Sequence, residues 1–303
     1  MPKKNVNLKS TVTTVITSYN KGPWLGEAID SALLQEIDHH EIIVIDDGSQ
    51  DNSRQVAESY GNKIRYVHQE NAGQVAAKNR GIELSTGNFI AFLDGDDRWL
   101  PTKLAKQLEK FESDPEVGVV YTDRLKFRED QIVLASNKLG HTPREGHVTE
   151  FLIYDMFVPF STSMVRKSFL DQAGWMSLDC PIAPDYDLWL RMSLVCKFAY
   201  VDEILMEYRT GIDSIGNRVK SKIDYTIKIQ EDFVENYFAG KFPYRRSLKR
   251  AYFSKYRSAG NFHLSQKNNW AAFKFFLKAA RHCPLDLRIY KNIVRSMIWN
   301  PWA

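Results

Sequence analysis

The stretch Phe89-Ile-Ala-Phe-Leu-Asp-Gly-Asp-Asp, residues 89–97, joins five apolar residues directly to an acidic run. A short, continuous apolar run is typical of a strand buried on both faces of a parallel sheet. Asp94 and Asp96 are two residues apart in an extended segment, so their side chains can point to the same side. Carboxylates at the end of a buried strand cost free energy unless they are paired or bind a cation. We therefore predict that Asp94 and Asp96 hold Mg²⁺ or Mn²⁺, hard cations that prefer oxygen ligands, and that Asp97 tolerates substitution.

Strand-like and helix-like segments alternate before this stretch. Further strands are predicted at residues 11–17, 41–45 and 65–68, and helical segments separate them. This alternation predicts right-handed crossovers and a mostly parallel sheet, in which ligands bind at the carboxyl ends of the strands. Three polar clusters follow strands and are expected on one rim: residues 17–20, 46–49 and 94–97.

Two common phosphate-binding loops are missing from the sequence. There is no Gly-x-Gly-x-x-Gly after the first strand and no Gly-x-x-x-x-Gly-Lys-Ser/Thr. Their absence argues against a dinucleotide oxidoreductase and against a P-loop nucleotidase. A protein that binds a nucleotide without either loop must neutralise the phosphates in another way, and a metal on Asp96 would do so.

Five segments, in the right order, resemble family 2 glycosyltransferases of the GT-A fold and together cover about residues 10 to 215. They are Val15-Ile-Thr-Ser-Tyr-Asn, Ile45-Asp-Asp-Gly-Ser-Gln-Asp, Asn71-Ala-Gly-Gln-Val-Ala-Ala-Lys-Asn-Arg-Gly, Gly87-Asn-Phe-Ile-Ala-Phe-Leu-Asp-Gly-Asp-Asp and Asp185-Tyr-Asp-Leu-Trp-Leu-Arg. The resemblance implies a Rossmann-like α/β fold, with a mostly parallel sheet flanked by helices and an α-helical C-terminal region after it.

The resemblance also implies a donor site. Thr17, Tyr19 and Asp47 match positions that contact the nucleotide base. Asp94 matches a position near the ribose or the metal. Asp96 matches the ligand of the metal on the diphosphate.

Other matching residues belong to the reaction and to the phosphates. Asp185 matches the catalytic base, and Arg209 looks like part of a later element near the phosphates. Arg80 either meets the diphosphate or faces solvent, and we leave both interpretations open. The chain departs from the family pattern at Pro184, where a Glu is common, and at Thr210, where a His is common.

The implied activity is a metal-dependent, inverting transfer of a sugar from a nucleotide-sugar, with a UDP-sugar favoured, to an acceptor hydroxyl. The acceptor is expected to be a saccharide or a lipid-linked molecule in the synthesis of cell-surface polysaccharide or glycolipid. Two alternatives remain open: a catalytically silent nucleotide-sugar-binding or scaffold protein that uses the helical tail, and an Asp-dependent phosphotransferase.

Length and composition set the expected domain organisation. The chain has 303 residues, 44% hydrophobic and 26% charged, as in folded globular proteins of about two domains. We expect a transferase domain over residues 1–218, with a donor half at about 10–100 and an acceptor half at about 101–218. Residues 219–303 are expected to form a basic helical extension.

The C-terminal region is strongly basic. Residues 241–303 hold 14 Lys and Arg and one acid, Asp286, hence +13, which leaves −9 elsewhere because the whole chain carries +4. The region resembles a tetratricopeptide-like hairpin, with one apolar stripe at Trp270, Phe273, Leu277 and Ala280. It could be a packed cap, or it could lie on an anionic membrane surface together with Trp299 and Trp302. No recognition motif supports a nucleic-acid partner.

Location is expected from what the sequence lacks. No run reaches the ~18 apolar residues that cross a bilayer, and the basic N-terminus has no apolar region or cleavage site. Cys180, Cys196 and Cys283 are scattered and odd in number, which argues against a disulfide framework. We therefore expect a cytoplasmic protein. Peripheral binding to the inner face of the plasma membrane is the alternative that we leave open.

Overall fold

The strands predicted at residues 11–17, 41–45, 65–68 and 89–93 lie together in one sheet in a computed structural model of the chain. The structure describes residues 11–129, 131–135, 142–211, 219–239, 241, 243 and 245–297. Two compact units are present, unit 1 with Met1–Val148 and Phe157–Ile212, and unit 2 with Thr149–Met156 and Asp213–Ala303. The expected boundary at residue 218 lies outside the described residues, so the division of function between the units stays a prediction.

The sheet of unit 1 is mixed, with a parallel half that carries the predicted strands. Its order is β3-β2-β1-β4-β8-β6-β9-β5, with β7 paired to β6. The strands are β1 (Val12–Ser18), β2 (His40–Asp47), β3 (Arg65–Gln69), β4 (Phe89–Asp94), β5 (Arg98–Trp99), β6 (Val117–Arg128), β7 (Gln131–Ala135), β8 (Met164–Arg166) and β9 (Lys197–Arg209). The first four strands are parallel to one another, β8 is antiparallel to β4 and β6, and β9 is parallel to β6.

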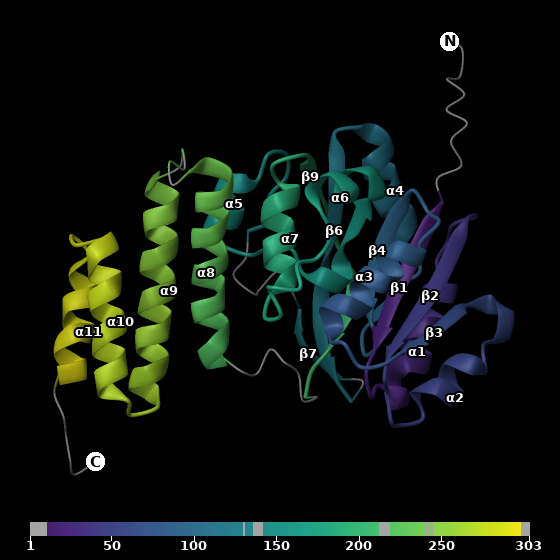
Figure 1. Cartoon of the computed structure of the whole chain (residues 1–303), viewed down its shortest axis with the longest axis horizontal. Coiled ribbons are helices and arrows are strands. Elements are labelled where there is room, and N and C mark those ends of the chain that lie inside the picture. Colours follow the sequence, from purple (N-terminus) through teal and green to yellow (C-terminus); the bar gives the residue numbers. More distant parts are fainter. Residues whose placement is uncertain are drawn as a thin grey trace. The chain divides into compact units, whose positions relative to one another are not determined.

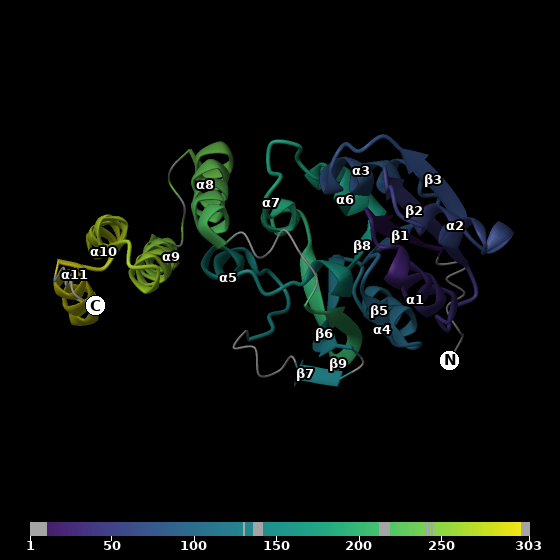
Figure 2. The same cartoon turned by 90° about the horizontal axis from the view of Figure 1, so that it is seen from below.

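Helices cover both faces of this sheet. They are α1 (Gly22–Leu33), α2 (Ser53–Glu58), α3 (Gln74–Leu84), α4 (Lys103–Ser113), α6 (Lys167–Ala173) and α7 (Pro184–Met192), with short 3₁₀ turns at Gly61–Lys63 and Phe160–Thr162. Figure 1 shows the strands side by side, and Figure 2 shows α3 and α6 on one side of the sheet and α1 and α4 on the other. The predicted α/β fold class is confirmed.

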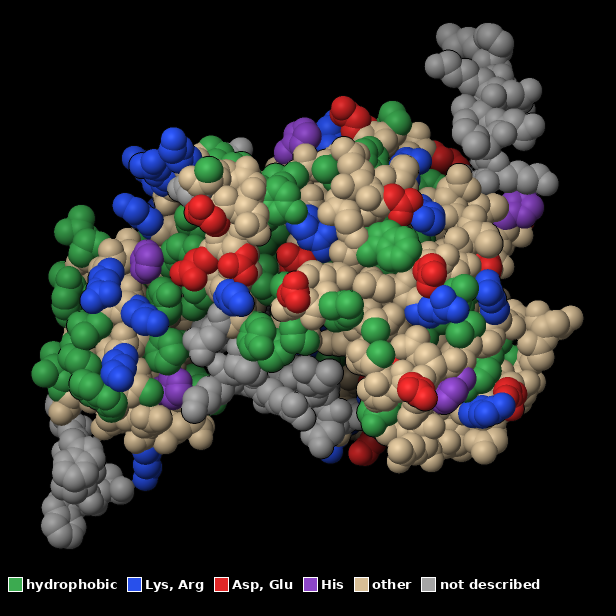
Figure 3. Space-filling model, in the orientation of Figure 1, with side chains coloured by type: hydrophobic (Ala, Val, Ile, Leu, Met, Phe, Trp, Pro, Cys, Tyr) green, Lys and Arg blue, Asp and Glu red, His purple; other side chains and the backbone are tan. Residues whose placement is uncertain are grey.

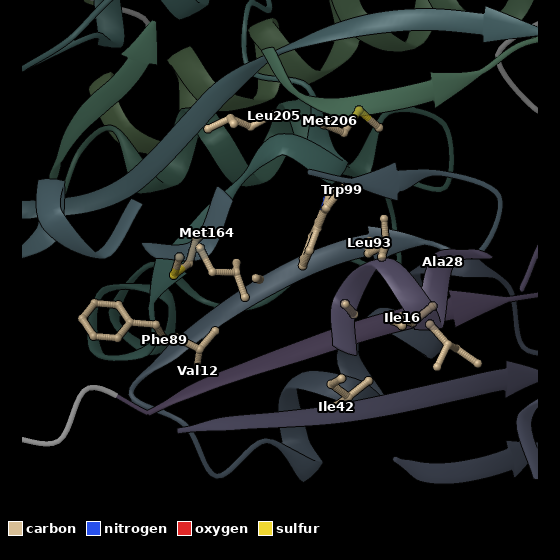
Figure 4. Packing of buried hydrophobic residues seen from close by; sticks show 14 of the residues in the cluster. Val12, Ile16, Ala28, Ile42, Phe89, Leu93, Trp99, Met164, Leu205 and Met206 are labelled. Carbon is tan, nitrogen blue, oxygen red and sulfur yellow. The ribbon is translucent and has the colours of Figure 1, made fainter. Parts of the chain in front are cut away.

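The larger core lies between the sheet and α1. Val12 and Ile16 of β1 are fully buried; Figure 4 shows Ile16 beside Ala28 of α1 and Val12 beside Phe89, and the same cluster includes Leu93 and Trp99. Burying a side chain such as Ile16 stabilises the fold by about 1.5–3 kcal/mol. The core fixes β1 and β4 as neighbours, which decides where their carboxyl ends meet.

On the opposite face, α3 approaches β1 closely. A Cβ added at Gly81 would lie 2.1 Å from Cγ1 of Val15, a buried side chain. Because β-branched Val has little rotamer freedom, only Gly fits at this crossing. The close approach brings Lys78, one turn earlier on α3, over the rim of the sheet.

The middle third lacks a clean period in the sequence, yet it supplies half of the sheet. The long strand β9 pairs with β6 in parallel and with the short β5 in antiparallel orientation. Only the first part of β6 is predicted from the sequence, at residues 117–122. Pairing with neighbouring strands stabilises β6 and β9. Their own residues show no regular alternation of buried and exposed positions, so the sequence offers no clear strand signal.

Unit 2 is helical, as predicted for the C-terminal region. Its helices are α5 (Thr149–Tyr154), α8 (Val219–Phe238), α9 (Arg245–Ser265), α10 (Asn269–His282) and α11 (Leu287–Met297). Its small core unites residues of α9, α10 and α11: Phe253, Ala272, Phe276, Ala279 and Ile289. Among the described helices, none is both long and apolar enough to cross a bilayer.

The stripe expected on α10 is not the face that the structure buries. Ala272, Phe276 and Ala279 are fully buried, whereas Trp270 is 65% exposed and Leu277 is 39% exposed. Both sets have helical spacing, and the positions of α9 and α11 decide between them. Trp299 and Trp302 lie outside the described residues.

Candidate functional site

The three predicted polar clusters meet on one rim, formed by the carboxyl ends of β1, β2 and β4. Thr17 is the register partner of Asp94 in β4 and of Ile45 in β2, and Ser18 is the partner of Asp46. This juxtaposition follows from the parallel register, and the predicted rim is confirmed. Tyr19, the next residue, is 48% exposed and so remains available to a ligand.

The loop after β1 is tied to the loop after β2. Asn20 adopts a left-handed φ of 53°, and its backbone N–H donates to Ser49 Oγ at 2.9 Å. The side-chain oxygen of Asn20 accepts from the Gln50 N–H at 2.8 Å. Asn tolerates this backbone region better than most residues. The two loops are therefore joined by two hydrogen bonds at the rim, just before Lys21.

Asp46 and Asp47 are both buried and both bonded within the protein. Asp46 accepts from the Tyr66 hydroxyl at 2.7 Å; burial raises the pKa of Asp46, but hydrogen bonds from Ser49 and Tyr66 bring it below its ordinary value. Asp47 accepts from the backbone N–H groups of Ala72 and Gly73 at 2.9 and 2.8 Å. Asp47 thus orders the loop before α3, and its contact with a nucleotide base stays a prediction.

The acidic turn, residues Asp94–Asp97, follows β4 directly. Its Gly95 N–H donates to the Thr17 carbonyl at 2.9 Å, and the Asp97 N–H donates to the Asp94 carbonyl at 3.0 Å. Two lysines from other elements balance the charge of the turn: Lys21 Nζ lies 2.5 Å from Asp96, and Lys78 Nζ lies 3.1 Å from Asp94. Neither lysine was singled out from the sequence, although Lys78 lies inside a quoted motif.

A divalent metal fits Asp94 and Asp96 only as a site shared with a substrate. Within the described residues, no group of three or more His, Cys, Asp and Glu side chains could hold a metal ion. Both carboxylates keep solvent-accessible surface, 36% for the Asp94 side chain and 18% for that of Asp96. Mg²⁺ and similar ions are commonly held by one or two carboxylates plus phosphate oxygens, which is the donor set that this rim and a nucleotide diphosphate would provide.

The expectation that Asp97 tolerates substitution freely does not fit its place in the structure. Its side chain is only 1% exposed, and its Oδ1 accepts from the Arg209 N–H at 3.1 Å. Burial, with the nearby charges of Asp96 and Asp94, raises the pKa of Asp97 well above its ordinary value. Asp97 is therefore a buried support of the turn.

Arg209, the last residue of β9, braces the same turn. Its Nε donates to the Asp96 carbonyl at 3.0 Å, and its guanidinium pairs with Glu27 at 2.6 Å. The guanidinium carbon also lies 4.4 Å from the Phe127 ring centroid. These contacts explain its position near the predicted phosphate site, while direct donor binding by Arg209 stays a prediction.

Arg124 of β6 connects the acidic turn to the predicted base. Burial lowers the pKa of Arg124, and the charges of Tyr208, Asp97, Asp123 and Asp185 act on it in the opposite direction. Its guanidinium carbon lies 4.9 Å from the Tyr208 ring centroid. One partly buried cation therefore interacts electrostatically with both Asp97 and Asp185. The sequence offers no local signal for it, because Arg124 belongs to none of the motifs.

Asp185 lies in the first turn of α7, where Pro184 begins the helix. Ala183 precedes them with a left-handed φ of 85°. Proline suits the first helical position, so Pro184 has a structural reason to stand where the family often has a Glu. The Asp185 Oδ1 accepts from the Tyr186 N–H at 3.0 Å, and α7 is anchored by the fully buried Trp189.

Arg80 contacts Glu83 on its own helix, with 2.6 Å between the charged groups, and is about half exposed. This position fits the solvent-facing interpretation of Arg80, and its contact with a diphosphate stays a prediction.

Comparison with known proteins shows the family of the chain. Residues 13–173 match the sequence model of the family described as Glycosyl transferase family 2. The chain belongs to this family. Among relatives, an uncharacterized glycosyltransferase of Rickettsia felis is 31% identical over 210 residues, which cover 65% of this chain and 34% of that protein. The putative teichuronic acid biosynthesis glycosyltransferase TuaG of Bacillus subtilis is 29% identical over 70% of this chain and 83% of its own length.

Solved structures support the same fold. The 1-349 fragment of S. aureus TarS in complex with UDP-GlcNAc has a TM-score of 0.69 at 17% identity, over 95% of this chain and 88% of that one. A mannosyltransferase from Pyrobaculum calidifontis, in complex with GDP-Man and Mn²⁺, has a TM-score of 0.59 at 16% identity, over 98% and 88% of the two chains. The predicted GT-A fold with a helical C-terminal region is confirmed.

Proposed function

We propose that this family 2 member transfers a sugar from a nucleotide-sugar, a UDP-sugar by preference, to an acceptor hydroxyl with inversion at the anomeric carbon. The observation that carries the proposal is the position of Arg124, whose charge interacts with Asp97 of the acidic turn and with Asp185, so the turn after β4 and the proposed base share one cation. A solvated turn alone would not require charges from the end of β4, from β6 and from α7 to interact.

In the proposed complex, the donor lies across the rim. Thr17, Tyr19 and Asp47 would contact the base, and Asp96 and Asp94 would hold Mn²⁺ or Mg²⁺ at the diphosphate. The metal would supply Lewis-acid stabilisation of the departing diphosphate, an effect of several kcal/mol. Arg80 and Arg209 are the proposed cationic neighbours of the phosphates.

Asp185 is the proposed general base. It accepts the proton from the acceptor hydroxyl, whose oxygen forms a bond to the anomeric carbon as the bond to the nucleoside diphosphate breaks. The attack comes from the face opposite the leaving group, so configuration inverts in one displacement. A positioned base typically contributes ~10²–10⁴-fold to the rate.

The proposed setting is the synthesis of cell-surface polysaccharide or glycolipid, with a saccharide or lipid-linked acceptor, at the cytoplasmic side of the membrane. The name of TuaG supports the first part of this proposal. The UDP-GlcNAc and GDP-Man in the two solved structures support a nucleotide-sugar donor.

Transfer assays with UDP-, GDP- and dTDP-sugars and Mn²⁺ test the activity. Asp185→Asn is expected to bind donor normally and to lose transfer by ~10²–10⁴-fold. Asp179→Asn, at an exposed carboxylate in the loop before α7, is the matched control and should transfer normally. Near-normal turnover by Asp185→Asn would remove Asp185 as the base, and donor binding without any transfer would favour the silent binding protein.

Chelation tests the metal. We expect excess chelator to abolish transfer, added Mn²⁺ to restore it, and Asp96→Ala to stay inactive at any Mn²⁺ concentration. Full activity in chelator would instead assign the diphosphate to the lysines of the rim, Lys21 and Lys78.

A further inference from the structure

Unit 2 contains a cavity of about 740 Å³ that the proposed reaction does not use. It lies between α5, the middle of α9 and the segment that joins α10 to α11. Its lining includes Tyr154, Arg250, Phe253, Arg257, Cys283 and Arg288. Figure 3 shows Lys and Arg side chains spread over the surface of this helical unit. The cavity therefore combines aromatic walls with a concentration of positive charge.

The arginines of the cavity are not fully neutralised. Asp286 is the one acidic lining residue, and it accepts from Arg288 at 2.9 and 2.6 Å. These bonds from Arg288 lower the pKa of Asp286 to about 2. Within the part of the chain that the structure describes, no carboxylate lies at ion-pair distance from Arg250 or Arg257. Three guanidinium groups thus face one carboxylate, which leaves a net charge of +2.

Arg257 is the most informative of the three. Its Nε is buried and has no hydrogen-bond partner among the described residues. The Phe253 ring, 5.6 Å from its guanidinium carbon, provides the nearest described aromatic surface. A buried donor on a cation is costly to leave unpaired, so Arg257 is suited to bind an acceptor that the described residues do not supply.

We propose that this cavity binds a phosphate group, held by Arg250 and Arg257 and bordered by the Arg288–Asp286 pair. Guanidinium groups match phosphate oxygens with two parallel hydrogen bonds, which an ammonium cannot do. A phosphomonoester carries about −1.5 to −2 charges at pH 7, which complements the net charge of the cavity. The cavity is larger than a phosphate ion alone, so the ligand class is a phosphate attached to a larger group, either a soluble sugar phosphate or a lipid headgroup. The inference does not depend on the donor site of unit 1.

Cys283 lines the cavity and gives a local reporter. Iodoacetamide alkylation of the full chain, followed by peptide mapping, measures the alkylation rate of Cys283 separately from that of Cys180 in unit 1. Inorganic phosphate is expected to slow alkylation of Cys283 and to leave Cys180 unchanged. At about twice the Kd, protection should be about threefold, as mass action requires. An unchanged Cys283 rate over the whole phosphate titration would overturn the proposal.

Three variants assign the effect to the arginines. Arg257→Gln should abolish protection, and Arg250→Gln, at an exposed position that carries less risk for folding, should weaken it. Lys274→Gln removes an exposed cation of α10 outside the cavity and should keep full protection. Full protection in both arginine variants would contradict the assignment.

Two further probes identify the source of the phosphate. Glucose 1-phosphate represents a soluble ligand, and phosphatidylcholine vesicles with phosphatidic acid represent a headgroup, against vesicles of phosphatidylcholine alone. Protection by the acidic vesicles, lost in Arg257→Gln, assigns a lipid phosphate. Protection by glucose 1-phosphate but not by vesicles assigns a soluble one. Protection by vesicles without any protection by inorganic phosphate would replace the phosphate site with general membrane adsorption.

Discussion

Lys21 Nζ lies 2.5 Å from Asp96 Oδ2, so a loop lysine occupies one oxygen of the carboxylate that we assign to the metal. Lys78 is placed in the same way at Asp94, 3.1 Å away. The two pairs offset part of the negative charge of the acidic turn. In the proposed complex, the donor and its metal would displace these lysines or take them as phosphate ligands.

Substitution of Lys21 separates these two roles. If Lys21 only competes with the metal, Lys21→Met should raise the apparent affinity for Mn²⁺ by about fivefold, because a partly exposed ion pair is worth up to about 1 kcal/mol. The measurement is the Mn²⁺ dependence of transfer at fixed donor. Lys63→Met, at an exposed position, is the control. A large rise in donor KM with no gain in Mn²⁺ affinity would show that Lys21 binds phosphate.

Arg124 is expected to act as a positioning residue for the base. Arg124→Met removes a cation that interacts with Asp185 and Asp97, so the acid limb of the pH profile of kcat/KM should move to higher pH. Arg124→Lys keeps the positive charge, so its acid limb should move less than that of Arg124→Met. Arg128→Met, further along β6 and exposed, should leave the profile unchanged. A loss of activity at all pH values with no shift would reduce Arg124 to a packing role.

Replacing Asp97 by Asn and by Ala should have different effects on the free energy of unfolding. Asp97→Asn keeps an acceptor for the Arg209 N–H, so we expect nearly normal stability. Asp97→Ala leaves that buried donor unpaired and should cost about 1–3 kcal/mol in the free energy of unfolding. Urea unfolding measures both. Equal stability of the two variants would mean that the bond to Arg209 is unimportant.

His40 makes folding stability depend on pH. Burial lowers the pKa of His40 from 6.5 to about 4, and its ring bonds to Thr14 Oγ1 at 2.7 Å. The unfolded chain therefore binds more protons between these values, so the free energy of unfolding should fall as pH drops from 6.5 to 4, by up to about 3 kcal/mol.

The comparison of His40→Gln with His39→Gln checks this expectation by urea unfolding at several pH values. His40→Gln should lose the extra pH dependence, whereas His39→Gln, at the exposed neighbouring position, should keep it. Parallel pH curves for the wild-type chain and His40→Gln would contradict a buried neutral imidazole at this place.

Much of the donor half could be predicted because its signals are local. The strand at residues 89–93 is apolar throughout, and a polar cluster follows it at once, so both the strand and its end can be read from neighbouring residues. The parallel register then brings Thr17 beside Asp94 without further information. The middle third could not be read in this way, because β9 is stabilised by β6 and β5 rather than by a period of its own.

By itself, the sequence determined the order of strands and helices in the donor half, the acidic turn at its end and the membership of family 2. These features depend on short runs of residues and on motif spacing. Only the tertiary structure decided that Lys21 and Lys78 neutralise Asp96 and Asp94, that Asp97 is buried, and that α10 buries Phe276 while Trp270 stays exposed. It also brought Arg124 within reach of Asp185. Burial and charge pairing depend on side chains distant in sequence, so packing, not local pattern, sets them.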